Sequence, residues 1–300
     1  MDPISAQISY VPFAERQKRK MPNDARLAVC VFPNLEHYEF MPRQISPRDP
    51  WPRMPHPDVL GYGLRDYGNR VGVWRLFEVL DRVGIRCTAC FSAAAFEHFP
   101  VLLEACEARS WDYMGHGVYN TRYNWDLSED DERAEIEDCV ETFRRLTGRA
   151  LNGWFSPSAT YTTATPRLVA NAGVRYICDF HFDDEPVPIE VSSDKTLLAL
   201  PYQMDLNDSA ILRGAFEGEC YLRTARDMFD TLYAEGASST RVMSIVVHPF
   251  IIGRPHRIRY LEEALTYIAS HDGVWFATGT ELTDWFEGPS DAALTIQARE

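Results

Sequence analysis

The sequence lacks several features that would assign the protein to a common class. No window approaches 18 consecutive apolar residues, so no membrane-spanning helix is predicted. Residues 1–20 contain no apolar core of a secretory signal, which favours a cytoplasmic location. Basic residues are not in excess, because 44 acidic residues stand against 30 Lys and Arg and give a net charge of −14. Nucleic acid and anionic membranes are therefore not expected as partners.

A cysteine pattern typical of disulfides or structural zinc is also missing. The seven cysteines are odd in number, and most lie inside apolar runs, as buried free thiols do. Cys87 and Cys90 form an isolated CxxC within the strand-like run IRCTACFS, where alternation sends the two side chains to opposite faces. We predict that this pair is structural. There is also no GxSxG or comparable elbow, so no serine or cysteine nucleophile is expected.

What the sequence does contain is a repeated order of apolar run, polar residue and turn. Strands are predicted at residues 26–33, 85–92, 111–114, 154–155, 175–179, 197–202, 243–247 and 274–277, and helices at 71–83, 96–108, 128–147, 165–172, 224–235 and 258–270. This alternation predicts one α/β domain with a closed or nearly closed parallel (β/α) barrel. Residues 1–25 are expected to form an N-terminal arm, 26–290 the barrel and 291–300 a tail. The proline-dense residues 41–60 are expected to form a long ordered loop.

Polar side chains follow the predicted strands, and in a parallel barrel the carboxyl ends of the strands carry the chemistry. These residues include Asn34, Glu36, His116, Ser156 and, after the apolar run of MSIVVHPF, His248. Acidic residues also occur at 179–184 and 205–208. Carboxylates and imidazoles from separate strands suit either a metal site that activates water or metal-free acid–base hydrolysis.

The motifs together resemble the polysaccharide deacetylase (NodB-homology) superfamily, and within it the branch of allantoinases and cyclic-imide hydrolases. The resemblance covers about residues 26–290. It rests on YGNRVGVWRLFEVLD (67–81), GHGVYN (115–120), WFSPS (154–158), FDDEP (182–186), PYQMDLND (201–208) and VVHPFIIGRPHR (246–257). The fold that it implies is a distorted barrel of about seven parallel strands.

The resemblance also implies an aspartate base and a divalent metal, such as zinc, on an Asp-His-His set. The aspartate positions correspond here to Asn34 and Glu36, the first metal histidine to His116 and the second to Asn120. Asparagine cannot act as a base and is a poor zinc ligand. Glu36 and His116 alone are fewer than the three protein ligands of a usual catalytic zinc, so the sequence favours no tightly bound metal.

The remaining family positions suggest further roles. His248 corresponds to the histidine that protonates or polarises the reacting group, and Asp184 to an acidic residue that orients a catalytic side chain or binds substrate. Ser156 and Trp154 are candidates to contact substrate, as are Asn34 and Asn120. Arg254 is a further candidate, with support of the turn or a contact to another subunit as the alternative. The alternative interpretations are a surface carboxylate for Asp184 and turn formers for Asp205, Asn207 and Asp208.

The sequence thus favours a hydrolase of a non-peptide C–N bond in a small amide or cyclic amide. Glu36 would activate water, and His248 or His116 would protonate the leaving nitrogen. One alternative is a metal-dependent N-deacetylase of a polysaccharide or peptidoglycan fragment, and another is a binding protein without activity. The basic arm and the arginine-rich turn at 253–257 predict a homo-oligomer, either a dimer or a tetramer.

Overall fold

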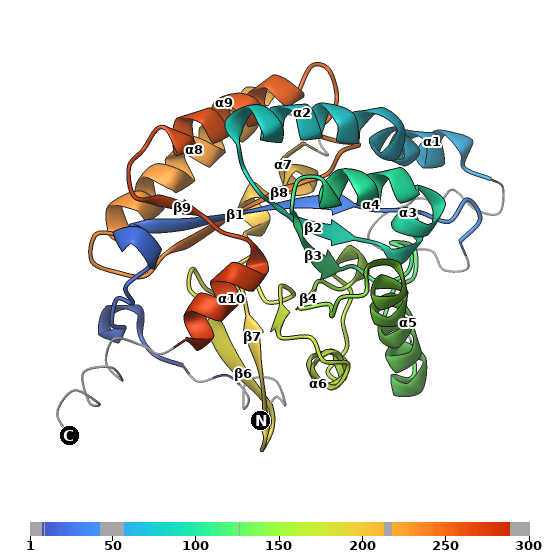
Figure 1. Cartoon of the computed structure of the whole chain (residues 1–300), viewed down its shortest axis with the longest axis horizontal. Helices are drawn as coiled ribbons and strands as arrows, with labels where there is room; N and C mark the ends of the chain where they lie inside the picture. The colour runs from blue at the N-terminus through green and yellow to red at the C-terminus, as the bar shows by residue number, and fades with distance from the viewer. Residues whose placement is uncertain (1–7, 9, 43–56, 126, 213–217, 289–300) are drawn as a thin grey trace.

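One strongly curved sheet forms the centre of the protein (Figure 1). The computed structural model describes residues 8, 10–42, 57–125, 127–212 and 218–288. Within these residues the strand order is β6-β7-β5-β4-β3-β2-β1-β8, with β9 paired to β1. The strands are β1 (Leu27–Leu35), β2 (Thr88–Phe91), β3 (Asp112–Gly115), β4 (Gly153–Trp154), β5 (Tyr176–Ile177), β6 (Val187–Ser192), β7 (Lys195–Ala199), β8 (Val242–Val247) and β9 (Val274–Phe276). All pairings are parallel except that of β6 with β7, so the predicted α/β barrel is confirmed as a curled, mostly parallel sheet.

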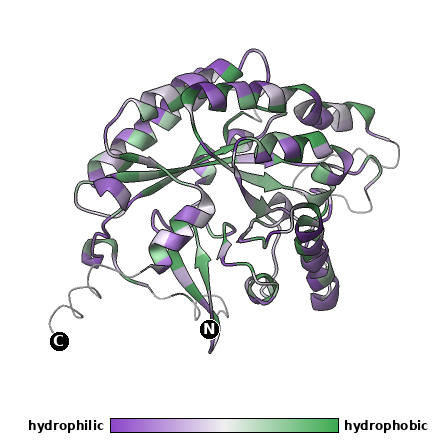
Figure 2. Ribbon diagram, in the orientation of Figure 1, coloured by the Kyte–Doolittle hydropathy of each residue, from purple (hydrophilic) through white to green (hydrophobic). Residues whose placement is uncertain are grey.

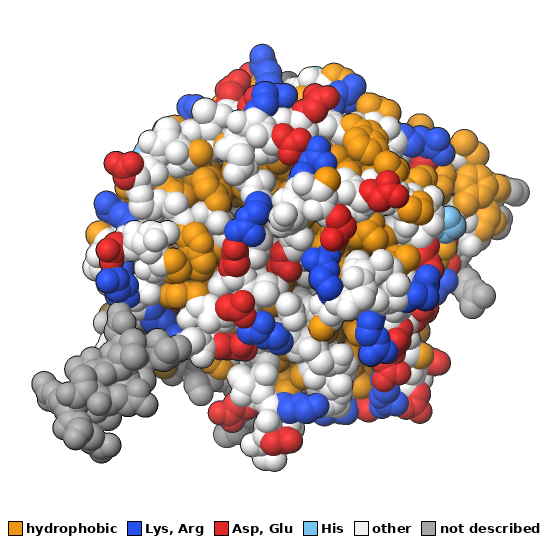
Figure 3. Space-filling model, in the orientation of Figure 1, with side chains coloured by type: hydrophobic (Ala, Val, Ile, Leu, Met, Phe, Trp, Pro, Cys, Tyr) orange, Lys and Arg blue, Asp and Glu red, His pale blue; other side chains and the backbone are white. Residues whose placement is uncertain are grey.

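Helices cover the outer face of the sheet, with their hydrophilic sides turned to solvent (Figures 1 and 2). They are α1 (Val59–Tyr67), α2 (Val73–Val83), α3 (Ala93–His98), α4 (Pro100–Glu107), α5 (Glu129–Thr147), α6 (Thr165–Asn171), α7 (Asp208–Leu212), α8 (Gly218–Glu235), α9 (Ile258–Ala269) and α10 (Gly279–Glu287). None of the helices in the described parts of the chain is both long and apolar enough to cross a membrane. Charges of both signs are interspersed over the face in Figure 3, and exposed apolar side chains gather at α1.

Strand β1 lies at the centre because its continuous apolar sequence allows burial on both faces, and every one of its residues is buried. One edge of β1 pairs with β8 from Ala28 opposite Val242 to Pro33 opposite Val247. The other edge pairs with β9 in its first half and β2 in its second half. Alternate side chains of β1 therefore contribute to a core under the helices and to a second core inside the curved sheet.

The edge strands of the sheet are β6 and β8, and the segment after β7 is joined to β8 by a side chain instead of a strand pair. Gln203 donates its backbone N–H to the hydroxyl of Ser244 (2.7 Å), and its Oε1 accepts the backbone N–H of Ser244 (2.6 Å). Its Nε2 donates to the carbonyl of Val242 (2.9 Å). One further backbone bridge joins Asn207 to Val246. The barrel is thus closed at this point mainly by one amide side chain.

Several elements differ from the sequence predictions. Helix α1 was not predicted, because Gly61 and Gly63 interrupt its pattern, and it continues into α2 through a π-helical turn η3 (Gly68–Gly72). The antiparallel strand β6 was also missed. The predicted long loop at 41–60 contains residues 43–56, which lie outside the described residues, and its end is the start of α1. The helix predicted at 96–108 is divided into two short helices at Pro100, and Cys87 and Cys90 are free thiols in opposite cores, as predicted.

Residues of the N-terminal arm pack against the amino-terminal end of the strands. Arg16 forms an ion pair with Asp183 (2.6 Å), and the Nζ of Lys18 donates to the carbonyl of Gly236 (2.6 Å). Met21 is buried in the core inside the curved sheet. The arm therefore covers the end of the barrel opposite to the carboxyl ends of the strands, and its charged groups are used within the chain.

Candidate active site

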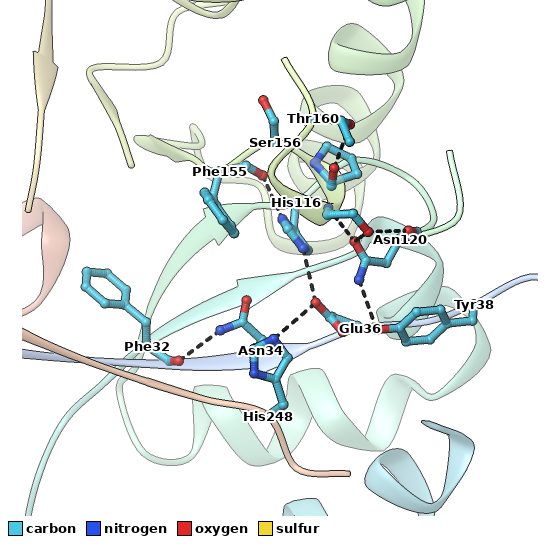
Figure 4. A network of polar contacts seen from close by, with 12 residues as sticks. Phe32, Asn34, Glu36, Tyr38, His116, Asn120, Phe155, Ser156, Thr160 and His248 are labelled. Carbon is cyan, nitrogen blue, oxygen red and sulfur yellow. Dashed lines mark hydrogen bonds and ion pairs between the residues drawn. The ribbon is translucent and has the colours of Figure 1, made fainter. Parts of the chain in front are cut away.

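The carboxyl ends of β1, β3 and β8 bring Glu36, His116 and His248 together (Figure 4). The sheet register explains this meeting, since Leu35 is level with Phe91 and Phe91 with Gly115, so Glu36 and His116 leave the sheet at one height. The Oε1 of Glu36 lies 3.2 Å from the Nε2 of His116 and 3.5 Å from the Nε2 of His248. All three side chains are at least nine-tenths buried, so the contacts are weakly screened by solvent.

His116 is held by the strand beside it. Its Nδ1 lies 2.7 Å from the carbonyl oxygen of Phe155, and its ring stacks on the ring of Phe155 with an interplanar angle of 2°. A carbonyl oxygen can only accept, so Nδ1 carries a hydrogen in this contact, and Nε2 is the nitrogen that faces Glu36. The imidazole is therefore presented to the site in one orientation.

His248 is held as a cation by a second carboxylate. Its Nδ1 lies 2.6 Å from the Oδ1 of Asp208, the first residue of α7, and Asp208 also accepts the backbone N–H of His248 (2.8 Å) and of Ile252 (3.2 Å). Burial opposes the charged imidazole, but the charges of Asp208 and Glu36 outweigh it and raise the pKa of His248 to about 10. At neutral pH His248 is an imidazolium that can donate a proton through Nε2.

Glu36 carries the complementary negative charge. Burial by itself would raise the pKa of Glu36, but the charge of His248 and hydrogen bonds from both histidines bring this pKa well below its usual range. The hydroxyl of Tyr38 donates to Oε2, and the side-chain amide of Asn69 holds the backbone carbonyl of Glu36 (2.9 Å). The carboxylate is thus ionised, with one oxygen turned to the histidines and the other to Tyr38.

The loop after His248 is seated on glycines of η3. A Cβ added at Gly72 would lie 2.0 Å from the carbonyl oxygen of Pro249, and one at Gly68 would lie 2.8 Å from the backbone N of Phe250. Within the loop itself, a Cβ added at Gly253 would lie 2.3 Å from the carbonyl oxygen of Pro249 and 2.6 Å from that of Gly72. These close backbone contacts require residues without a Cβ and support the position of His248.

Three of the predicted substrate-binding residues lie near the cluster and are buried. The Nδ2 of Asn34 donates to the carbonyl of Phe32 (3.1 Å) and contacts the hydroxyl of Tyr202 (3.2 Å). Asn120 contacts Tyr38 (3.0 Å), and Ser156 donates to Asp179 (2.7 Å). Burial raises the pKa of Asp179 to about 6, although hydrogen bonds from Ser156 oppose this change.

The structure does not bring Asp184, Arg254 or Trp154 to the cluster. The carbonyl of Asp184 accepts the N–H of Val242, the first residue of β8, whereas His248 follows the last residue of that strand. About 20 Å of strand therefore separates them. Arg254 lies 3.8 Å from the ring centre of Tyr67 and donates to the carbonyl of Leu64, which makes it a support of the turn. Trp154 packs in the core under the helices.

Asp208 and Tyr38 also belong to the site. Asp208 ends the motif PYQMDLND and is one of the predicted polar residues that follow an apolar strand, with a turn former as the alternative, whereas Tyr38 is not predicted. Tyr38 stands two residues after Glu36, and nothing in its local sequence distinguishes it from a core tyrosine. Its contact with Glu36 depends on the bend of the chain after β1.

The residues present do not fit the metal set of the superfamily. Asn120 stands at the position of the second histidine, but its Oδ1 already accepts the backbone N–H of Ser158 (2.8 Å) and the hydroxyl of Ser158 (3.1 Å). Its Nδ2 is a donor and faces Tyr38. Over the described part of the chain no three His, Cys, Asp or Glu side chains are arranged to hold a metal ion. Of the metal set implied by the resemblance, only the two predicted ligands Glu36 and His116 are present.

The chemistry available from these groups is acid–base. An ionised carboxylate faces the imidazolium of His248 and the ring of His116 inside a mostly buried site. Such a set can accept a proton from water at one position and donate one at another.

Comparisons with known proteins point to one family. Residues 64–177 match the polysaccharide deacetylase family. The chain is 25% identical over 291 residues to a Schizosaccharomyces pombe protein provisionally named a polysaccharide deacetylase, with 87% of this chain and 90% of that protein covered. The crystal structure of PuuE allantoinase is similar with a TM-score of 0.80 and 26% identity, covering 93% of this chain and 98% of the allantoinase. That of a probable polysaccharide deacetylase from Pseudomonas aeruginosa has a TM-score of 0.80 and 28% identity, covering 93% and 97%. The resemblance seen in the motifs is confirmed.

Proposed function

We propose that this chain, which carries a polysaccharide deacetylase domain, hydrolyses a C–N bond in a small amide or cyclic amide. The observation that supports this most is the contact of Glu36 with both His116 and His248 at the carboxyl ends of the strands. Similarity to an allantoinase and to polysaccharide deacetylases supports the reaction class, because an allantoinase hydrolyses a C–N bond and a deacetylase that acts on N-acetyl groups does the same.

In the proposed reaction, water attacks the carbonyl carbon and the C–N bond breaks. Glu36 accepts a proton from the water, and His248 gives its Nε2 proton to the departing nitrogen. The two transfers assist each other, because the charge of His248 is what lowers the pKa of Glu36. When His248 loses its proton, Glu36 becomes a stronger base. His116, with Nδ1 bound to the carbonyl of Phe155, keeps Nε2 directed at the same carboxylate oxygen.

The burial of the site favours a small substrate over a long glycan. The cluster is almost fully buried, and Asn120, engaged with Ser158, is unsuited to complete a metal set. A metal-dependent N-deacetylase of a polysaccharide or peptidoglycan fragment is the second candidate, supported by the family match. The homo-oligomer stays a prediction, and the two sequence features behind it, the arm and Arg254, both contact their own chain.

Substrate screens with matched variants test this function. Allantoin, hydantoins, cyclic imides and N-acetylated chitooligosaccharides are offered to the purified protein, with and without a chelator. We expect turnover of a cyclic amide, and a loss of about 10²- to 10⁴-fold in kcat for Glu36→Gln and His248→Ala with unchanged circular dichroism. His256→Ala, at an exposed histidine beyond the same turn, is the control.

Three outcomes would contradict the proposal. Full activity of either site variant would remove the assigned roles. Activity on chitooligosaccharides that disappears with the chelator would establish the deacetylase instead. Tight binding of a cyclic amide without any turnover would indicate a binding protein on the same barrel.

A further inference from the structure

The second oxygen of Glu36 has a partner that the reaction above does not use. Oε1 faces the two histidines, whereas Oε2 accepts the hydroxyl hydrogen of Tyr38. Tyr38 is buried, with 9% of its surface exposed, and its ring lies edge-on to that of Phe250 in the loop after His248. A phenol that touches a catalytic carboxylate from inside the protein can position it without contacting substrate.

The direction of the Tyr38 hydroxyl is set by Asn120 (Figure 4). Asn120 Oδ1 accepts the backbone N–H of Ser158, which can only donate, so the amide orientation is determined. Its Nδ2 then donates to the Tyr38 oxygen at 3.0 Å. Because this bond uses the phenol oxygen as acceptor, the hydroxyl hydrogen is free to point at Glu36. Ser158, Asn120, Tyr38 and Glu36 thus form one directed chain of hydrogen bonds.

Asn120 stands where the resembled superfamily has its second metal histidine, and its side chain is committed to Ser158 and Tyr38. We propose that Tyr38, oriented by Asn120, takes the place of a metal ion in this chain and keeps the Oε1 of Glu36 directed at the reacting water. This rests on the proposed function. Tyr38 is a positioning residue, since it acts through Glu36.

A neutral donor and a cation differ in ways that can be measured. The Tyr38 hydroxyl makes one charge-assisted hydrogen bond, which binds Oε2 and leaves Oε1 open to the histidines and water. Without the hydroxyl, Glu36 can rotate so that Oε1 leaves the line of attack, which slows the chemical step and leaves substrate binding largely as it was. Loss of the Asn120 amide should act in the same direction but more weakly, because it acts through Tyr38.

The kinetic test uses Tyr38→Phe, which keeps the ring. We expect kcat to fall by about 10- to 100-fold with KM changed less than about twofold, because the lost interaction acts on the transition state. The control is Tyr176→Phe, a buried tyrosine whose hydroxyl has no hydrogen-bond partner among the described residues. It should leave both constants unchanged. A Tyr38→Phe enzyme with full kcat would overturn the inference.

A second test measures the affinity for zinc and does not require a catalytically active protein. Zinc titrations by calorimetry compare the wild type with the Tyr38→Phe/Asn120→His double variant. We expect zinc binding at least about tenfold tighter in the double variant, which regains a histidine ligand and loses the competing phenol. Stoichiometric zinc in the wild type, or wild-type activity lost on chelation and restored by zinc, would overturn the inference. If the wild type turns over no substrate, the proposed function fails and the calorimetric comparison still decides the role of Tyr38.

Discussion

At the scale of single residues, the pairing of His248 with Asp208 determines which group of the site carries a positive charge. A buried histidine alone would lose its charge, because desolvation disfavours the imidazolium. The carboxylates of Asp208 and Glu36 together reverse this and raise the pKa of His248 from its usual 6.5 to about 10, with Asp208 contributing the larger part. The pair makes a proton donor that stays loaded at neutral pH. His248 can therefore act as the acid of the proposed reaction because Asp208, on a different element, keeps it protonated.

Asp208→Asn is predicted to shift the alkaline limb of the kcat/KM profile from about pH 10 to lower pH, because His248 must be protonated to act. A pH–rate profile of both enzymes measures this shift. The raised pKa also stabilises the fold fully below pH 6.5, and this stabilisation is lost as pH rises through 10. The stability gap between wild type and variant should therefore narrow toward pH 10. An unchanged alkaline limb would contradict the role of Asp208.

At the scale of elements, the π-helical turn η3 and the loop after His248 depend on each other. Gly68 and Gly72 present bare backbone to Pro249 and Phe250, and the loop could not approach so closely to any other residue. In the sequence the same stretch, YGNRVG, leads into the helix predicted at 71–83. Its glycines lower the helix propensity of the stretch. They are explained by the packing of the neighbouring loop.

Gly72→Ala is predicted to destabilise the protein by about 1–3 kcal/mol and to lower kcat, because the new Cβ would displace the turn behind His248. The matched control is Gly63→Ala in α1, where nothing lies within 4 Å of an added Cβ. That change should stabilise the protein by about 0.5–1 kcal/mol and leave kcat unaltered. Urea unfolding and steady-state kinetics compare the two variants, and equal effects of both would refute the packing argument.

At the scale of the whole molecule, the two ends of the barrel have different tasks. The carboxyl ends of the strands carry Glu36, His116 and His248, while the arm covers the opposite end with Met21 inserted into the core. Parallel barrels generally separate chemistry and stability in this way. Substitutions in the arm should therefore lower the free energy of unfolding more than they lower kcat.

Met21→Ala is predicted to lower the free energy of unfolding by about 2–4 kcal/mol, because it leaves a cavity in the core inside the curved sheet. The kcat at 25 °C should stay within about twofold of wild type, since Met21 lies at the far end of the strands. Chemical denaturation and kinetics on one preparation measure both. A large loss of kcat in the folded variant would show that the two ends are coupled.

The sequence alone determined the strand–helix order and the residues that leave the strands. Apolar periodicity is a local signal, so β1 and β8 and the positions of Glu36, His116 and His248 could be predicted from it. Helix α1 was missed because its glycines weaken the same signal. Asp184 was misplaced because a loop after a strand can turn toward either end of the barrel, and local pattern does not report which.

Only the tertiary structure decided the partners of those residues. That Asp208 charges His248, that Tyr38 binds Glu36 and that Asn120 turns to Tyr38 all depend on contacts between segments up to 82 residues apart. Such contacts follow from sheet register, from the bend after β1 and from the closure by Gln203. None of these three features produces a periodic pattern of apolar residues in the sequence. The local apolar pattern therefore determined which residues lie at the strand ends, and long-range packing determined the charge and orientation of their side chains.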